Sequence, residues 1–594
     1  MASTMALRGP DAEGVWLDEH VGLAHRRLAV IDLPGGTQPM TVEHDGRVLA
    51  ALTYSGEVYN YRELREELRG YGHQFRTNSD TEVVLVAYLQ WGEDFLQHLN
   101  GMFAFGLWDC QREKLVLARD RMGVKPLYYY PTPHGVLFAS EAKAILAHRL
   151  VPVEVDTDGL RAALTHNYKT PGESIYRGLA EVRPGHVVVV DRSGHRERAY
   201  WKLTPREHTD DVGTTVGTVR DLLSDIMTRQ MISDVSVCTL LSGGLDSSTV
   251  TALAARASGD TPVRTFAVDF VGQTENFVSD GHVFSPDAPY ARMLAEHVGT
   301  EHTEVVLPTA KLMDPLYRRS TLAAFDAPNQ MGDMITSAYL LFGAVRERST
   351  VALSGESADE IFGGYRWFHE PELVNAPTFP WMATQNASNG GVNPIIDILD
   401  PDLAALLNLP DHQERRYREA LDEIEYLDDE KPDDRKMREV LYLNQTRWLQ
   451  YLLDRKDRLS MAHGLEVRVP FCDHRLVDYV YNVPWAMKTF DGREKSLIRA
   501  AARDLLPESI LERLKSPYPS TQDLPYIQTL QTRAAEILTD DSAPVAGLLN
   551  PRRIHELLEK PLEHTAFGAN RRRIEMVLSL HDWLSTYPVR LTLN

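Results

Sequence analysis

This 594-residue sequence has few cysteines, no excess of basic residues and no long apolar runs, and each shortage excludes a class of protein. The three cysteines, Cys110, Cys238 and Cys472, lie far apart and form no CxxC pair. That spacing excludes a disulfide framework or a cysteine-rich zinc module and indicates a reducing compartment. Lys plus Arg number 63 against 84 Asp plus Glu, and the net charge of −21 argues against a general nucleic-acid backbone binder.

Signals for export and membrane insertion are missing as well. No apolar run approaches the roughly 18 residues that suggest a membrane span. The first residues, MASTMALRGPDAEG, contain no basic segment followed by an apolar stretch, so they do not read as a secretory signal. With 43% hydrophobic and 25% charged residues, the composition is that of a globular protein. We expect a cytoplasmic protein with small-molecule substrates and neither a nucleic-acid nor a membrane partner.

The first 200 or so residues have the pattern of an antiparallel sheet protein. Short apolar runs are broken by Gly, Pro, Asp and Asn, namely LAVIDL, VLAALTY, MFAFGLWD, KLVLARD, GVLFAS and HVVVVD. Two helices are predicted among them, at residues 61–70 and 81–92, from apolar residues at helical spacing.

The pattern changes after a polar stretch near residue 205. Beyond it, strand, loop and helix alternate, as in VSVCTLL, SGGLDSS and TVTALAARAS followed by VRTFAVDF, which predicts a parallel sheet flanked by helices. We therefore predict two domains, residues 1–204 and 215–594, joined by a linker at 205–214. The stretch at 370–434 is acidic and rich in Pro and Asn; we expect it to cover a surface, with a solvated helix near 414–434.

The most informative segment is SGGLDS, which follows an apolar strand, opens a predicted helix and comprises Ser242, Gly243, Gly244, Leu245, Asp246 and Ser247. Small residues let successive backbone N–H groups and a helix N-terminus face one anion. Asp246 adds an oxygen ligand for the Mg²⁺ that accompanies a polyphosphate. A plain strand-to-helix turn is the alternative, but it leaves the combination of hydroxyls, glycines and carboxylate unexplained. The sequence has no GxxxxGK[ST] and no GxGxxG motif.

SGGLDS resembles the pyrophosphate loop of the ATP pyrophosphatase enzymes, and three further segments resemble the asparagine synthetases among them. SGESADE at 354–360 is similar to their SGEGADE motif, with Ser357 in place of the second glycine. The segment at 455–473, RKDRLSMAHGLEVRVPFCD, matches the same family, and its Glu466 and Arg468 would be unusual inside an ordinary apolar strand. Lys515, in KSPY, stands where the family places a lysine that steadies phosphate charge.

This resemblance implies a doubly wound parallel-sheet domain that uses ATP and Mg²⁺. It implies catalytic roles for Lys515, Glu356, Asp246 and Asp359, with Asp246 and Asp359 holding the metal. It further implies a nucleotide site made by Leu241, Ser242, Gly243, Gly244, Asp246, Ser247, Val268, Ser354 and Gly355.

The N-terminal half resembles the glutaminase domain of class II amidotransferases, which have the fold of the N-terminal-nucleophile hydrolases, a sandwich of antiparallel sheets with helices. RGPD at 8–11, HRRLAVID, SGEVYN, NSDTE and RDRMGVKPLYY carry the resemblance. It implies that Arg27 binds the glutamine carboxylate, that Glu57 and Asp80 orient its backbone groups, and that Gly56 donates an N–H to the oxyanion. Ser55 stands where many relatives have an asparagine as second donor.

One departure concerns the nucleophile. Relatives that hydrolyse glutamine begin Met-Cys-Gly-Ile, and the cysteine freed by removal of Met uses its own α-amine as base. This sequence starts within the helix that precedes RGPD in relatives, and neither Cys110 in mid-domain nor Ser3 can replace that cysteine. We expect the polypeptide as written not to hydrolyse glutamine. Either the start is internal to a longer product, or the enzyme uses free ammonia or another amine.

The resemblance implies a ligase that amidates L-aspartate through β-aspartyl-AMP, releases AMP and pyrophosphate, and forms a homodimer. Its nitrogen would come from glutamine if a complete N-terminus exists, and otherwise from ammonia. A specialised-metabolite carboxylic acid as acceptor, or a catalytically silent sensing or scaffolding protein, are the alternatives. The β-lactam synthetases fit less well because they carry Tyr where this chain has Glu356. An RNA-modifying relative would need an RNA-binding domain.

Overall fold

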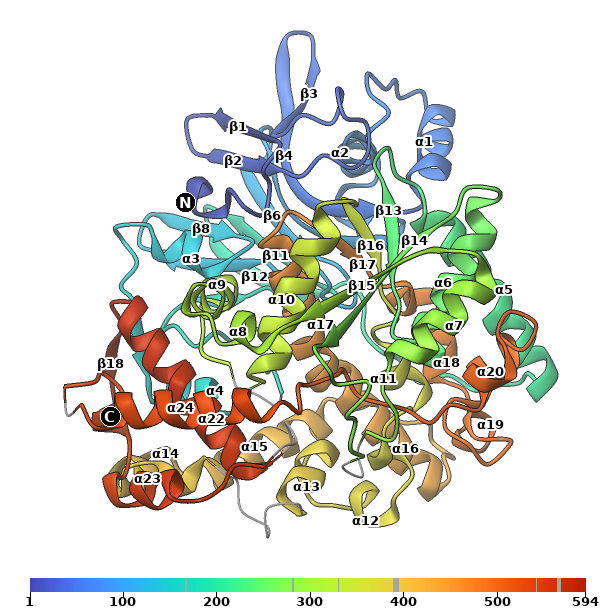
Figure 1. Ribbon diagram of the computed structural model, residues 1–594. Coiled ribbons are helices and arrows are strands. Elements are labelled where there is room, and N and C mark those ends of the chain that lie inside the picture. Colours follow the sequence, from blue (N-terminus) through green and yellow to red (C-terminus); the bar gives the residue numbers. More distant parts are fainter. Residues whose placement is uncertain are drawn as a thin grey trace.

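The computed structural model of the chain describes residues 1–165, 168–279, 283–329, 331–387, 395–540, 542–563 and 568–593. Figure 1 shows an N-terminal half built of sheets above a C-terminal half in which helices surround a central sheet. The two kinds of sheet confirm the predicted fold class, antiparallel in the first half and parallel in the second. No helix within the described ranges is long and apolar enough to cross a membrane.

A six-stranded antiparallel sheet forms the base of the N-terminal half. Its strands, in spatial order, are β12 (Gly194–Ala199), β11 (His186–Asp191), β6 (Lys114–Arg119), β5 (Gly101–Asp109), β4 (Arg47–Val58) and β3 (Met40–His44). Strands β5 and β6 are buried along nearly their whole length because both faces of this sheet are covered. Five of the six predicted apolar runs are confirmed as strands, four of them in this sheet.

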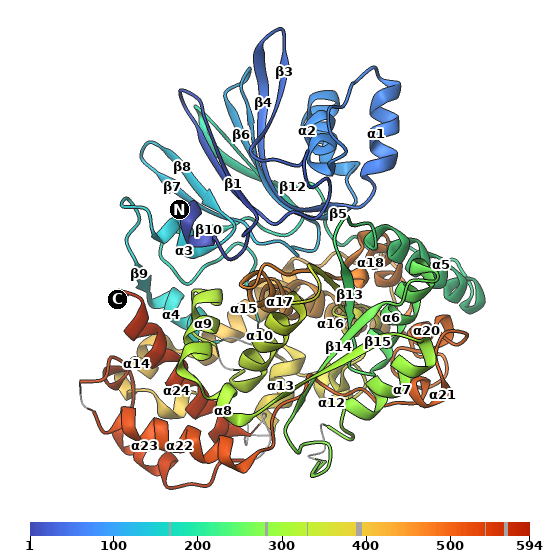
Figure 2. The same ribbon diagram turned by 45° about the horizontal axis from the view of Figure 1, so that its top comes forward.

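Helices cover one face of that sheet and shorter strands cover the other. The helices are α1 (Tyr61–Gly70) and α2 (Asp80–Trp91), which confirm the two predicted helices. The covering strands are β1 (Ala12–Leu17) with β2 (Gly22–Arg27), and β10 (Ala180–Glu181) with β7 (Tyr128–Thr132) and β8 (Gly135–Ala139). Figure 2 shows these layers from a second direction, with α1 and α2 on one side. Helices α3 (Ala142–Leu146) and α4 (Thr157–Leu164) follow toward the second half.

The run LAVIDL at 28–33 was predicted to be a strand, and that prediction is wrong. Val30 and Ile31 are buried in the hydrophobic core, but the segment forms a loop. Asp32 has a left-handed backbone with φ 51°, which a strand does not accommodate. The Arg27 side chain donates hydrogen bonds to the carbonyl oxygens of Leu33 and Asp32. Burial therefore explains the apolar run, while a side chain takes the place of ladder partners.

The C-terminal half is built on a five-stranded parallel sheet. Its order is β15 (Glu301–Leu307), β14 (Arg264–Phe270), β13 (Val237–Leu240), β16 (Val351–Leu353) and β17 (Glu466–Arg468). Helices pack around it, including α5 (Val212–Gln230), α6 (Leu245–Ser258), α7 (Ala288–Val298), α10 (Asp333–Arg346) and α17 (Leu449–Met461). Helix α5 begins inside the predicted linker, since the Asp211 side chain caps its N-terminus at Thr214.

The strand order places a crevice between β13 and β16. The chain passes from β13 outward to β14 and β15 and then returns to β16 on the other side of β13. At such a switch point the two following loops diverge and leave room for a ligand beyond the carboxyl ends of the strands. SGGLDS follows β13 and SGESADE follows β16, so the topology brings these two segments together.

The remaining helices complete the second half. They are α8 (Thr309–Leu312), α9 (Pro315–Phe325), α11 (Ala358–Phe362), α12 (Pro371–Val374), α13 (Pro380–Ala387), α14 (Pro401–Leu407), α15 (Leu409–Asp422), α16 (Pro432–Leu443), α18 (His474–Tyr481), α19 (Trp485–Lys488), α20 (Ser496–Ala501), α21 (Glu508–Leu511), α22 (Leu524–Leu538), α23 (Pro551–Leu558) and α24 (Ala569–Thr586). A short π-helix, Asn444–Trp448, joins α16 to α17. Near the C-terminus β18 (Arg590–Thr592) pairs in parallel with β9 (Glu154–Asp156) of the first half.

The stretch at 370–434 does more than cover a surface, which corrects that expectation; its residues 388–394 lie outside the described ranges. Phe379 and Trp381 are almost fully buried and pack with Tyr417 and with Tyr168 of the first half. Helix α15 does carry exposed acidic and basic residues on its outer face. The segment is therefore amphipathic, and its average composition conceals an aromatic inner face.

Candidate functional site

The two glycine-containing loops touch at the switch point. Gly243 has φ 71°, and a Cβ there would lie 2.5 Å from Tyr290 and Ala291, so the turn requires glycine. The Ser242 and Ser247 hydroxyls lie 3.0 Å apart and fix the loop ahead of α6. A Cβ on Gly355 would lie 2.8 Å from the Ser247 nitrogen. Glycine at 355 thus lets the second loop approach the first.

A cavity of about 380 Å³ opens beside these loops; we call it the C-terminal pocket. Of the nucleotide and catalytic residues predicted from the sequence, Gly243 alone does not line it. The lining includes Leu241, Ser242, Gly244, Asp246, Ser247, Val268, Ser354, Gly355, Glu356, Asp359 and Lys515. The cavity also reaches Lys495, Arg455, Lys456 and Arg572, four cations without a predicted role.

Two lysines neutralise the pair of aspartates in this pocket. Lys495 Nζ donates to both oxygens of Asp246, at 3.0 and 2.8 Å, and to Asp359 Oδ1 at 2.8 Å. Lys515 Nζ lies 2.5 Å from Asp359 Oδ2. Burial opposes ionisation, but Lys495 and Lys515 together lower the pKa of Asp359 to about 2. Burial raises the pKa of Asp246, although Lys495 acts in the other direction.

Glu356 is held by cations from helix α17. Its carboxylate lies 2.8 Å from Lys456 Nζ and 3.4 Å from the Arg455 guanidinium. Burial opposes ionisation here too, but Lys456 and then Arg455 lower the pKa of Glu356 below its usual range. Glu356 is therefore a carboxylate at neutral pH, with its charge already balanced.

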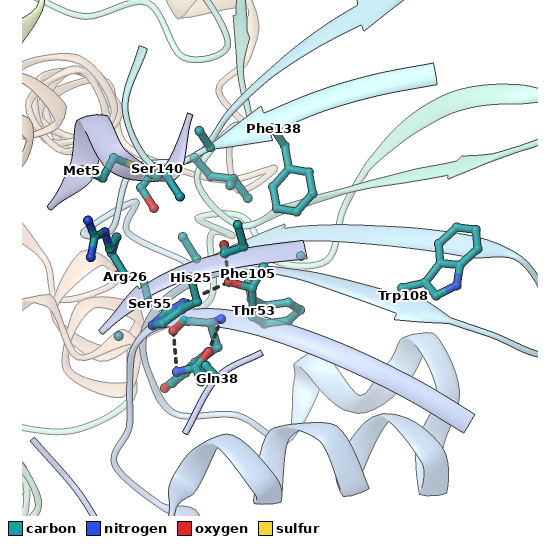
Figure 3. A pocket seen from close by; sticks show the side chains of 18 of the residues that line it. Met5, His25, Arg26, Gln38, Thr53, Ser55, Phe105, Trp108, Phe138 and Ser140 are labelled. Atoms are coloured by element: carbon teal, nitrogen blue, oxygen red, sulfur yellow. Dashed lines mark hydrogen bonds between the residues drawn. The ribbon is translucent and has the colours of Figure 1, made fainter. Parts of the chain in front are cut away.

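A larger cavity, of about 710 Å³, lies between the layers of the first half; we call it the N-terminal pocket. All the residues predicted to bind glutamine line it: Arg27, Ser55, Gly56, Glu57 and Asp80. Figure 3 shows Ser55 near His25 and Thr53, whose side chains are joined by a hydrogen bond of 3.0 Å. Gly56 has φ 131°, and a Cβ there would lie 2.0 Å from the Met102 carbonyl oxygen, so only glycine fits.

Two charged residues of the N-terminal pocket, Asp80 and Arg27, are engaged by neutral groups. Asp80 accepts hydrogen bonds from the Tyr54 hydroxyl at 2.8 Å and the Val58 backbone nitrogen at 3.0 Å. Arg27 donates to backbone carbonyls of its own loop. Burial, and secondarily Arg27, lowers the pKa of His25 to about 4. The imidazole is therefore neutral at physiological pH.

Known proteins match both halves of the chain. The asparagine synthase family matches residues 218–585, and the glutamine amidotransferase domain family matches residues 1–201. The chain belongs to the asparagine synthase family.

Curated members of this family match along nearly the whole chain. "Asparagine synthetase [glutamine-hydrolyzing] 3" of Bacillus subtilis (strain 168) is 40% identical over 99% of this chain and 95% of its own length. "Asparagine synthetase [glutamine-hydrolyzing] 1" of the same organism is 31% identical over 97% and 92%. "Asparagine synthetase B [glutamine-hydrolyzing]" of Escherichia coli (strain K12) is 28% identical over 93% and 84%. By family the chain is an ATP-dependent ligase with a glutamine amidotransferase domain.

In this asparagine synthase family member, Arg468 on strand β17 touches both pockets' walls. Its guanidinium lies 3.7 Å from Glu57 of the N-terminal pocket and 2.9 Å from Glu466. Its carbonyl oxygen accepts a hydrogen bond from the Ser354 nitrogen, at the start of the SGESADE loop. Burial, Glu466 and Asp80 raise the pKa of Glu57 well above its usual range, and Arg468 opposes them. The Arg468 side chain contacts one candidate site and its backbone carbonyl contacts the other, so this residue connects the two sites.

A second buried cluster crosses between the halves beside Arg468. Asp457 on α17 accepts from Arg8 at 2.6 and 3.1 Å and from Lys125 Nζ at 3.3 Å. Arg8 belongs to the RGPD segment and Lys125 to GVKPLYY. The sequence resemblance singled out these segments without indicating that they hold the synthetase half.

Lys495 is the functional candidate that sequence reasoning missed. It stands in GREKSL, outside every segment that resembles a known motif. Its backbone has φ 56°, an unfavourable conformation for a lysine, at the start of α20. No sequence signal marks such a position, because the left-handed turn is imposed by the surrounding fold.

Proposed function

We propose that this chain converts L-aspartate to L-asparagine with ATP, through β-aspartyl-AMP, releasing AMP and pyrophosphate. The observation that carries the proposal is the convergence of SGGLDS and SGESADE around Asp246, Asp359, Lys495 and Lys515 at the switch point. Such a cluster of loop N–H groups and cations suits a polyphosphate. The names of the relatives favour aspartate over a specialised-metabolite acid as the acceptor.

The first chemical step is attack of the acceptor carboxylate on the α-phosphorus of ATP. The bond from that phosphorus to the pyrophosphate oxygen breaks, and pyrophosphate leaves into the SGGLDS loop. Lys515 and Lys495 exchange their aspartate partners for phosphate oxygens and stabilise the charge that moves onto the leaving group. Ammonia then attacks the acyl carbon, AMP leaves with its phosphate oxygen, and a proton passes to solvent or a base. A dry pocket protects the adenylate from water.

The residues present fit a magnesium ion that arrives with the nucleotide. Asp246 and Asp359 both lie within 3.0 Å of Lys495 Nζ, so one cation can contact both carboxylates. Among the described residues there is no cluster of three His, Cys, Asp or Glu side chains that could hold a metal alone. One or two carboxylates plus phosphate oxygens are the usual setting of Mg²⁺. Bound there, it would neutralise phosphate charge.

The N-terminal pocket is proposed to bind glutamine. Arg27 would hold its carboxylate, with Glu57 and Asp80 near its ammonium group and Gly56 and Ser55 near the side-chain amide. Glutamine has no net charge, which suits a pocket in which Arg27 and Asp80 are engaged by neutral partners. A homodimer remains a prediction from the family resemblance.

The test is amide formation by the purified chain with ATP, Mg²⁺ and aspartate. ¹⁵N-ammonium and amide-¹⁵N-glutamine are offered in separate reactions, and labelled asparagine and AMP are measured. Labelled asparagine in either reaction supports the proposal, and comparison of the two identifies the nitrogen donor. A folded chain that gives asparagine from neither source contradicts it. Exchange of labelled pyrophosphate into ATP with each acid then shows whether another acceptor is activated.

A further inference from the structure

The C-terminal pocket continues past the catalytic loops to the C-terminal helix α24. Three consecutive arginines stand near the start of that helix, but Arg572 alone of them lines the pocket. Arg571 pairs with Asp333 at 2.7 Å, and Arg573 pairs with Asp397 at 3.1 Å. Arg572 therefore points in a different direction from Arg571 and Arg573, because successive side chains of an α-helix are rotated by about 100° around its axis.

Arg572 has no anionic partner within the described parts of the chain. No carboxylate oxygen among those residues lies within 4.0 Å of its guanidinium, and its Nε is buried without a hydrogen-bond partner. Burial lowers the pKa of Arg572 to about 10, and the more distant Glu563 offsets this only in part. The Arg572 side chain is partly buried, and a buried donor such as its Nε without a partner is costly, so such groups mark sites where an anion completes the pairing.

Arg572 and Lys515 line the same cavity but have different charged neighbours. Lys515 lies 2.5 Å from Asp359, whereas the charged groups that act on Arg572 are Glu563 and Arg573. A ligand that contacts both cations therefore needs an anionic group for each of them.

We propose that Arg572 binds the second, non-reacting carboxylate of the acceptor and so selects an amino dicarboxylic acid. The inference rests on the proposed function and names a specificity residue for it. A planar guanidinium can take both oxygens of a carboxylate in parallel hydrogen bonds. A monocarboxylic acceptor would leave Arg572 without an anionic partner and its buried Nε unsatisfied, and that cost is what excludes it.

The test compares two acceptors that differ in this carboxylate alone. β-Alanine is aspartate without its α-carboxylate, and both acids retain the carboxyl group that reacts. With saturating ATP and ammonium, AMP formation gives kcat and KM for each acid with wild type, Arg572→Gln, Arg572→Lys and the matched control Arg573→Gln. The KM for ATP and the circular dichroism spectrum of each variant report on folding.

In Arg572→Gln we expect the KM for aspartate to rise about 100-fold, with kcat changed much less, because a buried carboxylate–guanidinium contact is lost. The kcat/KM for β-alanine should stay within about threefold of wild type. The KM of Arg572→Lys for aspartate should lie between those of wild type and Arg572→Gln, because an ammonium group keeps the positive charge but cannot donate two parallel hydrogen bonds. Arg573→Gln should behave as wild type, because its partner Asp397 does not line the pocket.

Three results would overturn the inference while leaving amide synthesis intact. The first is an Arg572→Gln enzyme whose KM for aspartate is unchanged. The second is an equal loss of kcat/KM with both acids, which a purely structural arginine would produce. The third is a wild-type chain that uses β-alanine as well as aspartate. A wild type that activates neither acid contradicts the proposed function and this inference together.

Discussion

The N-terminal and C-terminal pockets are both lined with ionisable side chains, but several of the predicted ligand-binding residues in each have a different kind of partner. In the N-terminal pocket, Arg27 is bonded to backbone carbonyls and Asp80 to a hydroxyl and a backbone nitrogen. In the C-terminal pocket, lysines pair with Asp246 and Asp359, and α17 cations pair with Glu356. Hydrogen-bonded dipoles hold a charge in place, whereas ion pairs can exchange partners when a charged substrate arrives.

The difference follows from the substrates that we propose for the two sites. Glutamine enters without net charge, so its pocket needs hydrogen-bonding groups in fixed orientations more than charged groups that can change partners. ATP brings several negative charges, and bond cleavage moves charge between its oxygens. Its pocket therefore needs cations that can change partners as that charge moves. Arg468 lines neither pocket but contacts residues that line both. Variants that disturb one pocket, both pockets or neither therefore test the comparison.

The largest effect is expected from Lys515→Ala. Loss of the cation that lies beside Asp359 should reduce pyrophosphate exchange into ATP by about 10³-fold, because stabilisation of the moving charge is lost. Glutamine affinity, measured by calorimetry, should not change. Lys560→Ala, on an exposed residue outside both pockets, is the matched control. An exchange rate within threefold of wild type would remove Lys515 from the mechanism.

Arg468→Met should instead affect both pockets. It leaves Glu57 and Glu466 buried without their guanidinium partner, which should lower the free energy of unfolding by about 4 kcal/mol. The double variant with Glu57→Gln should recover about 1–2 kcal/mol, because a buried carboxyl group that has lost its guanidinium partner is removed. Urea titration and calorimetric glutamine binding measure the two effects. Additive losses in the double variant would show that Glu57 and Arg468 do not interact.

His25 should make stability depend on pH through the N-terminal pocket alone. Its pKa is about 4 in the folded protein and about 6.5 when unfolded, so protons favour the unfolded chain between these values. Its contribution is complete above pH 6.5 and declines as the pH falls toward 4. From pH 7 to pH 5, wild type should lose about 2 kcal/mol of unfolding free energy that His25→Asn does not lose. Parallel curves for the two proteins would contradict this.

The smallest effect is expected at Ser357, in the SGESADE loop. Its φ of 81° lies in the left-handed region, where a side chain costs about 1 kcal/mol. The serine hydroxyl lies 2.7 Å from the Cys472 sulfur, a weak interaction. Ser357→Gly should therefore raise the midpoint of thermal unfolding by about 1–2 °C. Ser357→Ala, which keeps the strain and loses the hydroxyl, should lower it.

The sequence predicted those parts of the fold and of the candidate sites that depend on residues adjacent in the chain. Alternating apolar runs marked the strands, and SGGLDS and SGESADE were expected at a nucleotide site before their contact was visible. Ser357 has a positive φ, which fits the glycine that the similar SGEGADE motif carries at that position. These segments were accessible because their chemistry depends on residues adjacent in the chain.

The features that the sequence did not reveal depend on distant residues. LAVIDL has the composition of a strand, but Arg27 and Asp32 bend it into a loop. Lys495 lies in the candidate site because the fold places it beside Asp246 and Asp359, which are distant from it in the sequence. Arg572 stands in an ordinary basic run, and only the helix direction separates it from Arg571 and Arg573. Local composition does not reveal contacts of this kind, because they form between residues that are far apart in the sequence.

The Asp457 cluster has a consequence for exchange of genetic material between relatives. Asp457 belongs to the C-terminal half, while Arg8 and Lys125, which neutralise it, belong to the N-terminal half. A hybrid gene that joins residues 1–204 of one relative to the remainder of another must keep these complementary charges. A mismatched hybrid would bury an unpaired carboxylate one residue away from Lys456, the partner of Glu356. The two halves are therefore constrained to diverge together, as one unit of inheritance.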